Sequence, residues 1–162
     1  ILMENEIQLN LGAGLTSQDF INKITELESL MLNSDLPGIV KFSEGESDIF
    51  PLTHSFSEGV YVREMFIPAG GFIIGKIQKF SHTVFLLKGK IIIATENGTE
   101  CYTAPCYINA TEGIKRAGYA LEDTTWVNVH PNHDNTQDIE TLENRLACSS
   151  YEEYNAYKLL NE

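Results

Sequence analysis

Four polar residues in the middle of the chain have the types and spacing of a binding site. Lys76, Gln78 and His82 belong to the segment KIQKFSH, and in a regular strand they share one face because side chains alternate. Arg116 follows a turn at Gly113, at the start of another predicted strand. An arginine can hold a carboxylate or phosphate through two parallel hydrogen bonds, a lysine adds a point charge, and a histidine donates a hydrogen bond or changes charge with pH. We therefore predict that these residues bind a small anionic molecule.

Arg63 and Tyr119 extend this predicted site. Arg63 and Glu64 are neighbours on one predicted strand, so their side chains point to opposite faces and do not pair with each other. If Arg63 points inward, it adds a second guanidinium. Tyr119 lies on a predicted strand and can stack on a ring in a pocket, although packing in a core or an interface is the commoner use of a tyrosine. We include both residues in the predicted ligand-binding set.

A different interpretation of the same residues needs no site at all. Lys76 and Lys115 can extend along the protein surface with their charges in water. Arg116 can pair with Glu64 or Glu122. The spacing of these residues does not decide between a pocket and a solvated face, so both remain open.

A metal site is the third interpretation. His82 would then be a ligand, and a shift of strand register would bring His54 or His130 toward it. The nearby lysine and arginine side chains repel a divalent ion, so we predict no metal cofactor. The segment HPNHD, residues 130–134, matches no standard zinc spacing, and we predict that it ends a strand and begins a helix.

The charge distribution is consistent with a basic pocket inside an acidic shell. The 162-residue chain has a net charge of −12. Residues 60–120 carry 7 of the 11 Lys and Arg but only 4 acidic residues, so this part has a charge of +3 and the flanks −15. Such a chain is not expected to bind a nucleic-acid polymer or an anionic membrane. The alternative is that charge accumulates on surface helices for solubility.

The sequence predicts a cytoplasmic protein. No apolar run approaches the roughly 18 residues that a membrane-spanning helix needs. The acidic N-terminal segment lacks the basic start of a signal peptide. The three cysteines, Cys101, Cys106 and Cys148, show no Cys-x-x-Cys spacing and are expected to be reduced thiols.

The elements that position these residues are mainly strands. Residues 39–130 hold short runs rich in Val, Ile, Phe, Tyr and Thr, separated by turn residues, which predicts a β-sandwich or barrel. Asn97-Gly98 predicts a hairpin with a type I′ turn. Helices are predicted over residues 16–33, with a capping box at Thr16 and Asp19, and over two segments between residue 135 and about residue 160. Asn135 or Thr136 is expected to cap the first of these two.

Two segments resemble the paired motifs of the cupins. The first is IPAGGFIIGKIQKFSHTVFLLKGKIII and the second is INATEGIKRAGYALEDTTWVNVH. The segment from His54 to His130 is similar to a group of small, largely uncharacterised cupin-like proteins of bacteria and tailed phages. The resemblance implies a jelly-roll β-barrel over residues 36–131, with an N-terminal helical extension over 1–35 and acidic helices over 132–162.

The resemblance also implies where a cupin would hold its metal. Lys76 and Gln78 stand where cupins have a histidine pair, His82 where they have a glutamate, and Arg116 where they have a third histidine. The typical metal ligands are therefore replaced, and a divalent metal at His82 is the remaining metal hypothesis. Cupins commonly pair their sheets, so the resemblance further implies a homo-oligomer.

Three functions follow as hypotheses. The first is non-catalytic binding of a small anionic molecule in the barrel, for example sequestration of a nucleotide signal in the host cytoplasm if the protein is phage-encoded. The second is a metal-dependent cupin enzyme, such as an isomerase, lyase or dioxygenase. The third is a structural or accessory component of a virion or other assembly. Fold alone does not choose among them.

Overall fold

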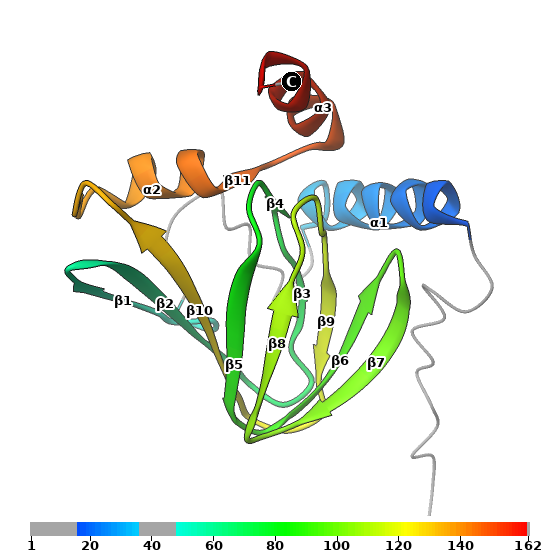
Figure 1. The fold of residues 1–162 in the computed structure, drawn as a ribbon. Coiled ribbons are helices and arrows are strands. Elements are labelled where there is room, and N and C mark those ends of the chain that lie inside the picture. Colours follow the sequence, from blue (N-terminus) through cyan, green and yellow to red (C-terminus); the bar gives the residue numbers. More distant parts are fainter. Residues whose placement is uncertain (1–15, 36–47, 162) are drawn as a thin grey trace, which may run out of the picture.

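The protein folds into two antiparallel β-sheets that face each other, with helices at one end (Figure 1). The computed structural model describes residues 16–35 and 48–161. The sheets converge at the lower end of Figure 1 and the helices lie at the opposite end. The predicted mainly-β jelly roll with one N-terminal helix and two C-terminal helices is confirmed, although the sheets are not joined into one closed barrel. The strand predicted near residue 39 lies outside the described residues.

The strands follow each other along the chain within residues 52–148. They are β1 (Leu52–Ser57), β2 (Gly59–Ile67), β3 (Phe72–Ile74), β4 (Ile77–Gln78), β5 (His82–Lys88), β6 (Lys90–Thr95), β7 (Gly98–Thr103), β8 (Cys106–Ala110), β9 (Ala117–Ala120), β10 (Thr124–Asn132) and β11 (Ala147–Cys148). One sheet has the order β1-β2-β10-β5-β8 and the other β3-β9-β6-β7, while β4 pairs with β11. The space between the two larger sheets therefore receives side chains from both.

Helix α1 (Ser17–Leu32) covers the outer face of the four-stranded sheet. Thr16 and Asp19 form the predicted capping box, which satisfies backbone N–H groups of the first turn. Phe20 and Ile24 are buried against Ala94 and Ala117 of the sheet. Leu30, in the last turn of the helix, is 64% exposed and does not pack on the sheet.

Two C-terminal helices flank the short strand β11. Helix α2 (Ile139–Leu146) is capped by Asp138, three residues after Asn135, so the predicted caps are wrong. Helix α3 (Tyr151–Asn161) begins with a hydrogen bond from the Glu153 amide to the Ser150 hydroxyl. Strand β11 was not predicted, because two residues of extended chain between two helices leave no periodic pattern.

The strand expected from Phe72 to His82 is interrupted twice. The Gly75 amide donates to the carbonyl of Arg116 at 2.9 Å, which ends the pairing of β3 with β9. The chain then crosses to pair with β11 through β4, and β5 starts only at His82. The regular alternation that would place Lys76, Gln78, Phe80 and His82 on one face is therefore wrong.

The hairpin at Asn97-Gly98 is confirmed, but its turn is shifted by one residue. Thr95 pairs with Gly98, so the two turn residues are Glu96 and Asn97. Gly98 has a φ of +124°, which glycine adopts without strain.

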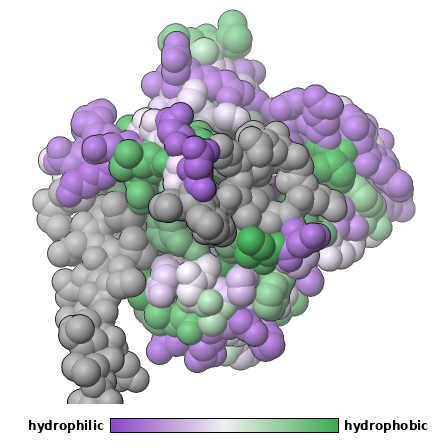
Figure 2. Space-filling model, turned by 180° about the vertical axis from the view of Figure 1, so that it is seen from behind, coloured by the Kyte–Doolittle hydropathy of each residue, from purple (hydrophilic) through white to green (hydrophobic). Residues whose placement is uncertain are grey.

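The surface seen from behind is mostly hydrophilic at its outer edges. Hydrophobic residues, coloured green, form small groups between hydrophilic ones (Figure 2). In the described ranges, none of the helices has the length and apolarity required to cross a membrane.

Candidate functional site

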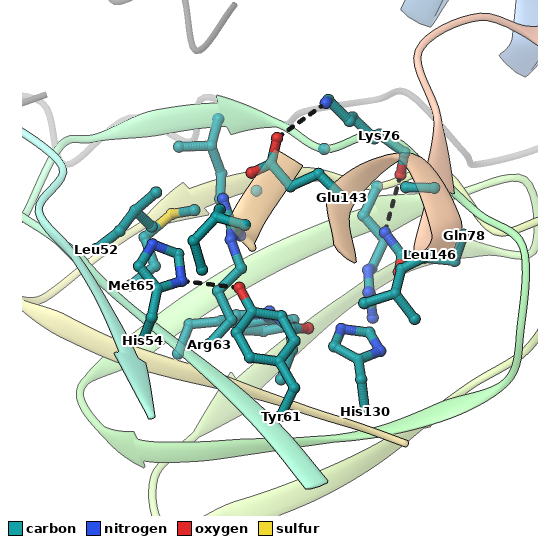
Figure 3. Close-up of a pocket in the computed structure, with 18 of the residues that line it drawn as sticks. Leu52, His54, Tyr61, Arg63, Met65, Lys76, Gln78, His130, Glu143 and Leu146 are labelled. Carbon is teal, nitrogen blue, oxygen red and sulfur yellow. Dashed lines mark hydrogen bonds and ion pairs between the residues drawn. The ribbon is translucent and has the colours of Figure 1, made fainter. Parts of the chain in front are cut away.

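A cavity of about 610 Å³ opens between the two sheets below α2. Its walls come from β1, β2 and β10 on one side and from residues 73–76, Gln78, Arg116 and Gly118 on the other. Helix α2 closes part of the top with Ile139, Glu143 and Leu146. Figure 3 shows Tyr61, Arg63 and His130 pointing into this space, with Lys76 and Glu143 above them. The volume is in the range of small-molecule sites.

Antiparallel pairing arranges the five-stranded sheet's side of the cavity in three rows. Side chains at paired positions of β1, β2 and β10 lie next to each other on one face. The deepest row is Leu52–Met65–Trp126, the middle row His54–Arg63–Asn128, and the upper row Phe56–Tyr61–His130. The deepest row joins the main hydrophobic core, and Tyr61 of the upper row packs against α2.

Two guanidinium groups, those of Arg63 and Arg116, face the cavity without full partners. The Nε of Arg63 and the Nη1 of Arg116 are buried and make no hydrogen bond. Within residues 16–35 and 48–161, neither arginine lies within ion-pair distance of a carboxylate. The interpretation in which Arg116 pairs with Glu64 or Glu122 is therefore wrong.

Arg116 is held between an indole and an imidazole. Its guanidinium carbon lies 5.4 Å from the ring centroid of Trp126, and its Nη2 lies 3.3 Å from Nε2 of His82. Burial lowers the pKa of Arg116 to about 10. The group is still charged at neutral pH, so the cavity contains a cation that the protein does not neutralise.

His82 supports Arg116 rather than lining the cavity itself. A guanidinium only donates hydrogen bonds, so its contact with Nε2 requires that this nitrogen carries no proton. The Nδ1 of His82 lies 3.3 Å from the carbonyl oxygen of Phe80. Because a carbonyl oxygen only accepts, the proton of the ring is on Nδ1. Asn128 Oδ1 is also 3.3 Å from Nε2 but accepts from the Trp126 indole. Burial and the charge of Arg116 both lower the pKa of His82, which favours this neutral form.

His130 lies close to both guanidinium groups. Its ring centroid is 4.5 Å from that of His82 and 6.1 Å from that of Tyr61. Burial, followed by the nearby His82, Arg63 and Arg116, lowers the pKa of His130 to about 3. His130 is therefore neutral at pH 7. Its neutral imidazole can donate one hydrogen bond and accept another without adding a charge to the cavity.

The His54–Tyr61 pair completes the polar part of the wall. Nδ1 of His54 lies 2.8 Å from the Tyr61 hydroxyl. Burial raises the pKa of Tyr61 to about 12, so the phenol stays neutral. The pair fixes both rings at the edge of the cavity (Figure 3).

Lys76 and Gln78 lie in the wall, but not as free ligand groups. Lys76 Nζ pairs with Glu143 of α2 at 3.3 Å across the mouth of the cavity, and its side chain is 41% exposed. Gln78 Nε2 donates to the Lys76 carbonyl at 3.3 Å, which leaves its amide oxygen for a ligand. The structure thus brings Arg63, Gln78 and Arg116 to the cavity, with His82 behind Arg116.

Tyr119 and Lys115 do not line the cavity. Successive residues of β9 point to opposite faces, and Gly118 is the one that lines it. Placing Tyr119 in the pocket was therefore incorrect. Lys115 neither joins the site nor reaches solvent, because its buried Nζ pairs with Glu28 of α1 at 2.6 Å.

A second, smaller cavity of about 220 Å³ lies behind the first. Glu100 and Tyr102, which are hydrogen-bonded to each other, belong to its lining. Ile93, Arg116 and Trp126 line both cavities. The stacked guanidinium and indole therefore form part of the wall between them.

The residues present do not fit the divalent metal that the cupin motifs imply. Three His, Cys, Asp or Glu side chains placed to hold an ion are found nowhere in the described part of the chain. Nε2 of His82 instead lies 3.3 Å from Nη2 of Arg116. A cation at that distance opposes a second cation, so no chemical step is derived through a metal.

Sequence reasoning missed most of the wall on β1 and β10. Trp126, Asn128 and His130 alternate along β10 and all line the cavity, as His54 does from β1. The segment that begins with His130 was predicted to end a strand and begin a helix. The alternation of Trp126, Asn128 and His130 was the available signal.

Comparisons with known proteins found matches among solved structures alone. No protein-family model and no curated protein matches the chain. Among solved structures, a cupin domain from Bordetella pertussis is 19% identical, with 51% of this chain and 93% of that chain covered and a TM-score of 0.42. An RmlC-like cupin from Shewanella frigidimarina is 8% identical, with 62% and 93% covered and a TM-score of 0.47. Ectoine synthase from P. lautus is 16% identical, with 56% and 75% covered and a TM-score of 0.47.

Proposed function

We propose that the protein binds a small anionic molecule in the cavity and does not transform it chemically. One observation carries the proposal: Arg63 and Arg116 each present a buried nitrogen with no hydrogen-bond partner. A buried guanidinium without a counter-charge is costly, because it has lost water without gaining a negatively charged partner. A bound carboxylate or phosphate would supply both the charge and the missing acceptors.

The electrostatics of the histidines favour binding over acid–base catalysis. A general acid or base works best with a pKa near the working pH. The pKa of His130 is lowered to about 3, and that of His82 is lowered as well. His82 also accepts a hydrogen bond from Arg116 in its neutral form. These rings are suited to orient an anion and a guanidinium at neutral pH.

The proposal is tested by thermal unfolding and calorimetry with acetate and inorganic phosphate as probes. Wild-type protein should be stabilised and should bind at least one of them, whereas Arg63→Gln and Arg116→Gln should lose that binding. Lys88→Gln removes one positive charge from an exposed position outside the cavity and should bind as wild type. If larger carboxylates and phosphate esters also fail to bind, the proposal is wrong.

Elemental analysis tests the metal-enzyme alternative directly. Protein purified without chelator or affinity tag should contain no stoichiometric metal. One metal per chain in wild type, lost in His82→Ala, would place a metal-dependent enzyme first.

The predicted homo-oligomer has a candidate surface on the outer face of the five-stranded sheet. Phe85, Leu87 and Tyr107 are 39%, 57% and 69% exposed there. We propose that a second copy covers this face, and sedimentation analysis of wild type and of Phe85→Lys tests it. A monomeric wild type would refute the proposal. The phage setting and the cellular location remain predictions from the sequence.

A further inference from the structure

The anion-binding groups of the cavity lie between apolar surfaces. The middle row holds Arg63, and Arg116 reaches the cavity from the opposite sheet. Below them lie Leu52, Met65 and Trp126, which join the hydrophobic core. A charged head held by the guanidinium groups would therefore have hydrocarbon directly beneath it.

Apolar side chains also surround the cavity on its other sides. Ile73 and Ile93 line the wall formed by the four-stranded sheet. Ile139 and Leu146 line it from α2, above the guanidinium groups. A ligand body that carries many hydroxyl groups would leave some of them without partners against these surfaces, which costs affinity.

The mouth of the cavity disfavours a second negative charge. Lys76 is already paired with Glu143 at 3.3 Å. Glu140, on the same helix, also lines the cavity, and no ion pair with it occurs among the described residues. A ligand with an anionic group at each end would therefore bring its outer charge toward an acidic side chain.

We propose that the ligand is a monocarboxylic acid with an apolar body, whose carboxylate is held by Arg63 and Arg116. The inference rests on the anion-binding function proposed above and adds the chemical class of the ligand. A carboxylate can accept hydrogen bonds from two guanidinium groups, and Arg63 and Arg116 both line the cavity without a carboxylate partner among the described residues. The volume of about 610 Å³ exceeds what a carboxylate alone would fill.

A series of six simple compounds tests the inference by calorimetry. Acetate and hexanoate differ by four methylene groups. Gluconate is a hydroxylated six-carbon acid, and adipate is a six-carbon acid with two carboxylates. Hexanol has the apolar chain without the charge, and inorganic phosphate has the charge without an apolar chain. Each buried methylene should tighten binding about fourfold, so hexanoate should bind about 200-fold more tightly than acetate. Gluconate, adipate, hexanol and phosphate should each bind at least tenfold more weakly than hexanoate.

The outcomes separate this inference from the function on which it rests. Equal binding of acetate and hexanoate, or binding of gluconate, adipate or phosphate as tight as that of hexanoate, would overturn the apolar monocarboxylate while leaving anion binding intact. Hexanol binding as tightly as hexanoate would overturn both. Binding of none of the six would overturn the apolar monocarboxylate, and failure of phosphate esters to bind as well would overturn anion binding. In Arg63→Gln, the affinities for acetate and for hexanoate should fall by the same factor, because the variant changes only the contact with the carboxylate. An unchanged affinity for hexanoate in that variant would overturn the placement of the carboxylate.

Discussion

Replacing Arg116 by methionine should make the ligand-free protein more stable. The guanidinium stacks on Trp126 and donates to His82, but no carboxylate among the described residues pairs with it. Methionine keeps much of the apolar stem and removes the charge. Lys115→Met is a matched contrast, because Lys115 is also a buried cation but is paired with Glu28 at 2.6 Å.

The magnitude follows from two opposing contributions. The pKa of Arg116 falls from 12.5 to about 10, which corresponds to a cost of about 3 kcal/mol for holding the charge in the folded state. The stack on the indole and the hydrogen bond to His82 together contribute about 2 kcal/mol in the other direction. The variant should therefore gain about 1 kcal/mol, a rise in Tm of about 2–4 °C for a chain of this size.

Urea unfolding in a buffer without carboxylate or phosphate measures this difference. Arg116→Met should unfold at higher urea with an unchanged slope, whereas Lys115→Met should unfold at lower urea because it leaves Glu28 without its partner. A loss of 2 kcal/mol or more in Arg116→Met, with its circular dichroism spectrum intact, would show that the charge is compensated in the ligand-free protein. That result would remove the main support for an anion site.

Three further predictions concern pH, a buried ion pair and a turn. The pKa of His130 is lowered from 6.5 to about 3 in the folded protein, so the unfolded chain binds a proton at this residue first as the pH falls. The free energy of unfolding should therefore decrease by about 1.4 kcal/mol per pH unit between pH 6.5 and pH 3. His130→Gln should flatten this part of the urea-unfolding profile, and an unaltered profile would contradict the assignment. Glu28→Gln should lower the free energy of unfolding in urea by about 3 kcal/mol, because it leaves the buried ammonium of Lys115 without a partner. This loss should exceed that of Lys115→Met, and a smaller loss would contradict the ranking. Gly89→Ala should lower the free energy of unfolding by about 3 kcal/mol or more, because φ is +88° and the added Cβ would clash with the backbone oxygen of Asp123. Gly59→Ala, where φ is +74° and no atom lies near the added Cβ, should cost about 1 kcal/mol in the same assay. Equal losses would refute the steric argument.

Local signals in the sequence predicted those parts of the fold that depend on neighbours along the chain. The capping box of Thr16 and Asp19 begins α1 as expected, because both partners lie within four residues. Simple alternation predicted that Arg63 and Glu64 point to opposite faces, although it did not decide which of the two points inward. The predicted hairpin at residues 95–98 formed as well, with its turn moved by one residue.

The errors arose where pairing with distant strands overrides the local pattern. The segment from Phe72 to His82 reads as one strand, yet it breaks at Gly75 because β4 pairs with β11, about 70 residues later in sequence. The segment HPNHD was expected to end a strand and begin a helix, but pairing of Asn132 with Gly59 extends β10 and holds His130 in the wall of the cavity. Lys115 appeared to be a surface cation because its partner, Glu28, belongs to a helix 87 residues earlier.

The shared wall between the two cavities has an evolutionary consequence. Only a few side chains, among them Arg116 and Trp126, separate a space of about 610 Å³ from one of about 220 Å³. Replacement of one of these two by a small residue would open the larger space toward the smaller, with no change in strand order. Descendants of this chain could thus come to accept longer compounds through a single codon change, while a change that removes Arg116 would also give up one of the two charges on which selectivity depends. The range of compounds that such descendants could bind therefore depends on Arg116, which supplies part of the positive charge of the cavity.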